Sequence, residues 1–156
     1  MKKHIIRVVA CTMLLAASCS INNHNQNNTV MKQRIDTDQA PAAIGPYSQA
    51  IDSGHGLIFV SGQLPIDPAT GAFPEGGVQE QTRQSLTNAE AILKAAGLSL
   101  ANVVKTTVFL ADMGDFAAMN EIYAQFFSEP YPARSAVAVK TLPKGALVEV
   151  ECIAAR

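Results

Sequence analysis

The sequence predicts one α+β domain, in which two helices cover one face of a mixed or mostly antiparallel sheet. Strand and helix patterns follow one another over residues 33–156 in the order three strands, helix, strand, helix and two strands. The chain of 156 residues suits one domain. A chain of this size supplies no third layer for the other sheet face, so we expect self-association to cover it.

The N-terminal residues are predicted to direct export. Residues 1–18 form a signal peptide pattern, because basic side chains precede an uncharged apolar run too short to span a bilayer. Small residues precede Cys19, as in a bacterial lipoprotein signal, although Ala16 stands where that signal usually has leucine. We therefore expect a periplasmic or membrane-anchored lipoprotein of a bacterial envelope, lipidated at Cys19. Ordinary signal cleavage is the alternative. The Asn-rich residues 19–32 are predicted to be a flexible tether.

The first three strands are expected at residues 33–37, 47–51 and 56–61. The third contains an apolar run suited to a buried strand. Proline and glycine then recur through residues 64–77, which predicts a loop.

A long helix is predicted over residues 78–96, where Gly97 is the expected C-cap and Leu98 the apolar residue beyond it. A second helix is expected after Asp115, its predicted N-cap, and ends before Pro130. Residues at helical spacing define the predicted buried faces: Thr82, Leu86, Ala89, Leu93 and Ala96 in the first helix, and Phe116, Met119, Tyr123 and Phe126 in the second.

The remaining strands are expected at residues 102–111, 135–140 and 147–153, with a turn at residues 142–145. In the last strand the alternation places Val148, Val150 and Cys152 on one face and Glu149 and Glu151 on the other.

Composition argues against several classes of function. The net charge is −1, with 12 basic and 13 acidic residues and no basic stripe, so a nucleic-acid partner is not expected. His55 is the only histidine in the predicted domain, and it has no second ligand at zinc spacing, so no metal site is expected. Cys152 is the only cysteine there and is predicted to be a small core residue.

Short stretches of the chain resemble the RidA/YjgF family, also called the endoribonuclease L-PSP family. They are residues 40–49 (APAAIGPYSQ), 60–65 (VSGQLP), 115–120 (DFAAMN), 132–135 (PARS) and 148–154 (VEVECIA). Each string alone is a weak signal. Their order and the matching succession of strands and helices make the resemblance specific over nearly the whole predicted domain.

The resemblance implies a chorismate-mutase-like fold and a homotrimer with clefts between its subunits. It also implies an activity without a cofactor: enamines such as 2-aminoacrylate tautomerise to 2-imino acids such as 2-iminopropanoate, and the protein speeds their hydrolysis to 2-keto acids and ammonia. The expected partners are the small imino or keto acid and other copies of the chain, with a membrane contacted only through the lipid anchor.

Arg134 and Glu149 are the candidate catalytic residues. The planar Arg134 guanidinium, within the Pro-Ala-Arg-Ser match, can hold a substrate carboxylate with two parallel hydrogen bonds. The resemblance places the catalytic carboxylate at Glu149, which would orient water and move protons, and leaves Glu151 as the structural carboxylate. Taken without the resemblance, each of these residues is more often a solvated surface side chain.

Tyr47, Ser61, Gly62 and Asn120 are the candidate substrate-binding residues. The Tyr47 phenol could cover the substrate or donate a hydrogen bond, and Ser61 and Gly62 stand where a strand meets a loop. Asn120 is expected to support the site from the second helix. Many relatives have cysteine at the position of Ala136, so a thiol nucleophile there is excluded in this chain, while hydrolysis directed by a carboxylate is not.

Two other functions are also compatible with the sequence. A trimeric protein could bind small carboxylates in the same cleft without turnover, which would suit export, because the sources of such imines are cytosolic. Endoribonuclease activity is the other alternative, and the near-neutral charge and the lack of paired histidines argue against it.

Overall fold

The computed structural model describes residues 31–156. The predicted signal peptide, Cys19 and the tether up to residue 30 lie outside the described residues. None of the helices within residues 31–156 has the length and the apolar character needed to cross a membrane.

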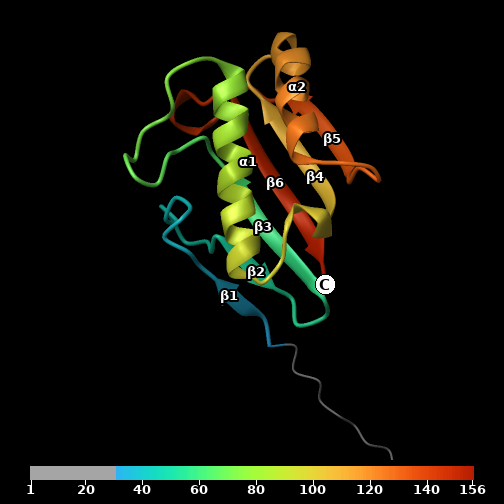
Figure 1. Ribbon diagram of the computed structural model, residues 1–156. Helices are drawn as coiled ribbons and strands as arrows, with labels where there is room; N and C mark the ends of the chain where they lie inside the picture. Colours follow the sequence, from blue (N-terminus) through green and yellow to red (C-terminus); the bar gives the residue numbers. More distant parts are fainter. Residues whose placement is uncertain (1–30) are drawn as a thin grey trace, which may run out of the picture.

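Six strands form one mixed sheet in the order β1-β2-β3-β6-β4-β5 (Figure 1). β4 and β5 are parallel, and every other neighbouring pair is antiparallel. The strands are β1 (Gln33–Ile35), β2 (Ala50–Asp52), β3 (Leu57–Gln63), β4 (Val103–Leu110), β5 (Ala133–Ala138) and β6 (Val148–Ala155). The predicted mixed sheet is therefore confirmed, and β6 lies near its centre.

Two helices, α1 (Val78–Ala95) and α2 (Phe116–Phe126), lie on the same face of this sheet, as predicted (Figure 1). α1 ends in a Schellman motif, in which Gly97 has φ 74° and the Leu98 N–H donates to the Leu93 carbonyl at 2.9 Å. Leu86 and Leu93 of α1 are buried against the sheet, and each side chain of this kind contributes about 1.5–3 kcal/mol to folding.

The start of α2 differs from the prediction in its hydrogen bonding. Asp115 occupies the N-cap position, but its side chain accepts no backbone hydrogen bond. The carboxylate of Asp112 instead accepts from the Gly114 N–H at 2.8 Å and starts a short 3₁₀ turn, Met113–Asp115, that leads into α2. This extra turn explains why the capping carboxylate lies three residues earlier than predicted.

Two strands are shifted from their predicted positions. The strand expected at residues 47–51 starts only at Ala50, because the Tyr47 N–H bends back to the Gly45 carbonyl at 2.8 Å. The strand expected at residues 135–140 starts at Ala133, where pairing with β4 begins. Pro132 precedes it and has no N–H to contribute to the sheet.

The predicted alternation in the last strand is confirmed. Val148, Val150 and Cys152 of β6 are buried beneath the helices, while Glu149 and Glu151 lie on the other face. We call this second face, which neither helix covers, the open face.

The open face carries several large exposed apolar side chains. Phe59 of β3 and Val137 of β5 are 44% and 46% exposed there. Phe109 of β4 pairs with Val137 of β5, so the apolar row spans these two strands, and it ends at Glu149 of β6. Large apolar side chains that share one exposed face are typical of an interaction surface.

Candidate active site

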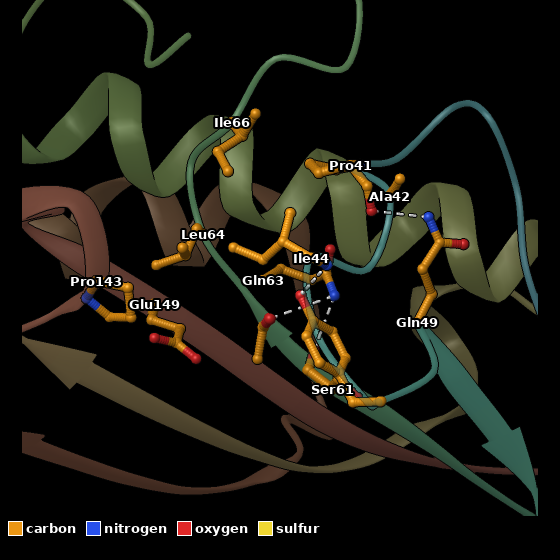
Figure 2. A pocket seen from close by; sticks show the side chains of 12 residues that line it. Pro41, Ala42, Ile44, Gln49, Ser61, Gln63, Leu64, Ile66, Pro143 and Glu149 are labelled. Carbon is orange, nitrogen blue, oxygen red and sulfur yellow. Dashed lines mark hydrogen bonds between the residues drawn. The ribbon is translucent and has the colours of Figure 1, made fainter. Parts of the chain in front are cut away.

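A cavity of about 310 Å³ lies where β3 and β6 meet the loops that follow β1 and precede β6 (Figure 2). Much of its wall is apolar and comes from Pro41, Ile44, Leu64, Ile66 and Pro143. The polar side chains on it include Tyr47, Ser61 and Glu149. A mainly apolar cavity with a few convergent polar groups is the usual form of a small-molecule site.

Glu149 is the carboxyl group of this cavity. It lies on β6 with its side chain half-buried beside Gly62 of β3. Burial raises the pKa of Glu149 above its ordinary value, and the nearby charge of Glu151 raises it further. Such a group can both take and give a proton nearer to neutral pH than an ordinary carboxylate can.

Ser61 and Tyr47 belong to one hydrogen-bonded loop region. The Ser61 hydroxyl donates to the Ser48 carbonyl at 2.7 Å, so its one proton is already used and it faces the cavity as an acceptor. The Tyr47 hydroxyl accepts a hydrogen bond from the Ile44 N–H at 3.3 Å, and its own proton is free to be donated. Tyr47 is 48% exposed at the cavity mouth.

Two buried glutamines on the cavity wall were not predicted. The Gln49 side chain donates to the Pro41 carbonyl at 2.8 Å (Figure 2). It also accepts from the Thr37 N–H at 2.7 Å, and together these bonds fix the loop that carries Tyr47. Gln63 donates to the Ser61 carbonyl at 2.9 Å. Both lie inside the stretches that carry the family resemblance. A polar residue next to a buried strand is the sequence feature that could have identified them as part of the site.

Arg134 lies on β5, next to α2 and away from this cavity. Its guanidinium carbon is 4.4 Å from the centroid of the Tyr123 ring and 5.6 Å from that of Phe116, distances at which a cation is attracted to an aromatic face. The Tyr123 hydroxyl is hydrogen-bonded to Thr106 at 2.8 Å, and burial raises the pKa of this phenol. Asn120 lines the same hollow as Arg134.

The sheet register separates Arg134 from Glu149. Arg134 pairs with Thr106 of β4, whereas Glu149 pairs with Phe109. Thr106 and Phe109 are an odd number of residues apart, so their side chains and those of their partners point to opposite faces. The two strands are separated by β4, which puts the two backbone positions about 14 Å apart. One chain therefore brings Tyr47, Ser61 and Gly62 to Glu149, and Asn120 to Arg134, but it does not bring Arg134 to Glu149.

The remaining predicted positions lie in the core or on the surface. Cys152 is buried on the helix side of β6, and burial raises its pKa to about 12. Ala136 pairs with Val108 on β4. Within residues 31–156, no three His, Cys, Asp or Glu side chains are grouped as metal ligands.

The fold and the cavity together define a class: a small α+β domain that carries a half-buried carboxyl group in a cleft beside an uncovered sheet face. Residues 37–156 match the family model described as Endoribonuclease L-PSP. The chain belongs to this family, the RidA/YjgF family of the sequence resemblance.

Individual relatives support the same assignment. The chain is 56% identical over 124 residues to a RutC family protein of Pyrococcus horikoshii, which covers 80% of this chain and 98% of the relative. It is 52% identical over 127 residues to the 2-iminobutanoate/2-iminopropanoate deaminase of Capra hircus, over 81% of this chain and 92% of the relative. The crystal structure of Escherichia coli TdcF with bound serine matches with a TM-score of 0.75 and 50% identity, over 80% of this chain and 98% of that one.

Proposed function

We propose that the protein hydrolyses reactive 2-imino acids, formed from enamines such as 2-aminoacrylate, to 2-keto acids and ammonia without a cofactor. The observation that carries this proposal is the half-buried Glu149 carboxyl group, with its raised pKa, in a mainly apolar cavity. The relatives named as deaminases support it. The size of the cavity, about 310 Å³, suits a small acid.

The complete site is proposed to form between copies of the chain in a homotrimer. Arg134 and Glu149 lie on opposite faces of one chain's sheet, so a single chain supplies the substrate with only one of them. The open face, with Phe59 and Val137 exposed, offers a surface on which a second copy could pack. We propose that Arg134 of a neighbouring copy completes the cavity that holds Glu149.

In this arrangement the Arg134 guanidinium holds the substrate carboxylate with two parallel hydrogen bonds. Glu149 accepts a proton from water while the water oxygen bonds to the imine carbon and the C=N electron pair moves to nitrogen. Glu149 then passes this proton to the nitrogen, which restores the carboxylate. The resulting carbinolamine then loses its hydroxyl proton to the Glu149 carboxylate as the C–N bond breaks. Glu149 returns a proton to the departing nitrogen, so the products are the 2-keto acid and ammonia.

The test is to generate 2-aminoacrylate with a separate pyridoxal-phosphate enzyme and to follow pyruvate release. The wild-type protein is expected to speed release, and Arg134→Ala and Glu149→Gln to reduce it to the rate in buffer. Arg83→Ala and Glu75→Gln are matched controls, because Arg83 is an exposed α1 residue that contacts Gln125 and Glu75 is exposed in the loop before α1. A wild-type rate equal to that of buffer contradicts the proposal.

Binding of small carboxylates without turnover is the second candidate function. The observation that favours it is the relative from Escherichia coli whose structure contains bound serine. Calorimetry with 2-oxobutanoate distinguishes the two functions: heat of binding together with no pyruvate release supports a binding protein, and heat together with release supports the enzyme.

The protein is further proposed to act outside the cytoplasm as a lipoprotein attached through Cys19. The basic and apolar residues before Cys19 support this. Expression of the full chain in a bacterium, followed by membrane fractionation and mass spectrometry of the mature N-terminus, tests it. We expect a diacylated or triacylated Cys19 in the membrane fraction, and release of Cys19→Ser from that fraction. A mature N-terminus without lipid overturns the proposal.

A further inference from the structure

Gly62 lies in a bulge of β3 directly beside the Glu149 carboxyl group. Val60 pairs with Cys152 and Gln63 with Val150, so Ser61 and Gly62 together face the single residue Glu151. A bulge of this kind changes the direction of a strand and is frequent next to active sites. It brings the backbone of residue 62 close to the side chain of Glu149.

The space that a side chain at residue 62 would need is already filled. A Cβ built on Gly62 would overlap Oε1 of Glu149 and would lie 2.9 Å from its Cδ and 3.2 Å from its Cγ. These three atoms, which are the nearest to that Cβ, all belong to the Glu149 side chain. Gly62 is not among the glycines with positive φ, so its conformation is open to other residues. The need for glycine here is therefore set by Glu149.

The bulge cannot easily move aside, because three hydrogen bonds hold Ser61, the residue before Gly62. The Ser61 N–H donates to the Gln49 carbonyl at 3.0 Å, and the Ser61 hydroxyl donates to the Ser48 carbonyl at 2.7 Å. The Gln63 side chain donates to the Ser61 carbonyl at 2.9 Å. The end of the Glu149 side chain, in contrast, can rotate. An added methyl group would therefore displace the carboxyl group rather than the strand.

We propose that Gly62 is a positioning residue: by lacking a side chain, it leaves the space that holds the Glu149 carboxyl group against the β3 bulge. The inference rests on the proposed function, in which Glu149 moves the protons. It gives Gly62 a role through Glu149, distinct from the substrate-binding role that the sequence predicts. In Gly62→Ala, the fold persists while the carboxyl group moves toward solvent.

The test compares Gly62→Ala with Gly77→Ala in the full-length protein. Gly77 is a suitable control because its φ is −98° and a Cβ there meets nothing within 4 Å. We expect Gly62→Ala to lower kcat on the order of 100-fold, the range of a general acid–base contribution, with little change in KM and a melting temperature near that of the wild type. Gly77→Ala should keep the wild-type kcat.

Two further measurements show whether the effect runs through Glu149. Because coupled residues are not additive, adding Gly62→Ala to Glu149→Ala should not weaken the binding of 2-oxobutanoate, measured by calorimetry, any further. In protein with ¹³C-labelled glutamate, NMR titration should show the pKa of the Glu149 carboxyl group falling in Gly62→Ala, because the group gains contact with water. Glu149→Gln identifies the resonance.

A further loss of 2-oxobutanoate binding in the Glu149→Ala background, or a rise in KM alone, overturns the inference and favours direct contact of residue 62 with substrate. An unchanged Glu149 titration in Gly62→Ala also overturns it. A wild-type protein without activity would contradict the proposed function. The NMR titration does not depend on turnover, so it would still show whether Gly62 positions Glu149.

Discussion

The surroundings of Arg134 and those of Glu149 differ in what they supply. Arg134 rests on the aromatic rings of Tyr123 and Phe116 on the helix side of the sheet. Glu149 lies on the open face beside Gly62, and the one charge that acts on its pKa, that of Glu151, is also negative. The cation is thus held in place by its own chain, while residues 31–156 of that chain bring no cation to the carboxyl group. This difference is what the proposed shared site requires, in which each region would supply one half.

Subunit complementation tests whether Arg134 and Glu149 of different copies form one site, and it has the largest expected effect. Arg134→Ala and Glu149→Ala are each expected to be inactive, and their coexpression is expected to restore activity. If each site takes Arg134 from one copy and Glu149 from the next, a mixed trimer keeps about one intact site in three. Two affinity tags isolate the mixed trimers, and the pyruvate assay measures them. Mixed trimers without activity would contradict a shared site.

The Arg134 region can be tested through its aromatic support. Tyr123→Leu removes the ring beneath the guanidinium, and since a cation–π contact contributes about 0.5–2 kcal/mol, KM should rise about tenfold. Tyr123→Phe keeps the ring and loses only the hydrogen bond to Thr106, so its KM should stay near that of the wild type. Steady-state kinetics measure both. Equal KM values for the two variants would show that the ring does not hold Arg134.

The Glu149 region can be tested through stability, where the expected effect is smallest. The pKa of Glu149 is raised in the folded protein, so its ionisation favours the unfolded state. At a pH below about 4.3, the pKa of the group in the unfolded chain, Glu149 is protonated in both the folded and the unfolded state and costs no stability. The loss of folding stability grows as the pH rises through the raised pKa of the folded state.

Glu149→Gln should therefore melt at a higher temperature than the wild type at pH 7, and at about the same temperature near pH 3.5. Calorimetry at the two pH values measures this. Glu75→Gln, in the exposed loop before α1, is the matched control and should show no such difference. A Glu149→Gln variant less stable than the wild type at pH 7 would mean that the folded protein favours the charged carboxylate.

Local patterns in the sequence were sufficient to predict most of the fold. The alternation from Val148 to Cys152 predicted the faces of β6, and Gly97 predicted the end of α1. The start of β2 was missed because the turn at Tyr47 depends on hydrogen bonds within the loop, in which Gln49 reaches residues up to twelve positions away.

The arrangement of the candidate site was harder to predict. The face of the sheet on which Arg134 lies depends on the parallel register between β5 and β4, and these two strands are not adjacent in the sequence. The closeness of Gly62 to Glu149 likewise depends on a bulge between β3 and β6. Sequence patterns report the period of one strand, and they do not report how that strand is aligned with its neighbours.

The burial of Cys152 has a consequence for life in an oxidising compartment. With a pKa of about 12, only about one thiol in 10⁵ is ionised at pH 7, and the thiolate is the form that oxidants and disulfides attack. Cys152 is the only cysteine within residues 31–156. If the domain is exported as proposed, it would thus need no disulfide isomerase, and its thiol would be protected from forming unwanted links with other secreted proteins.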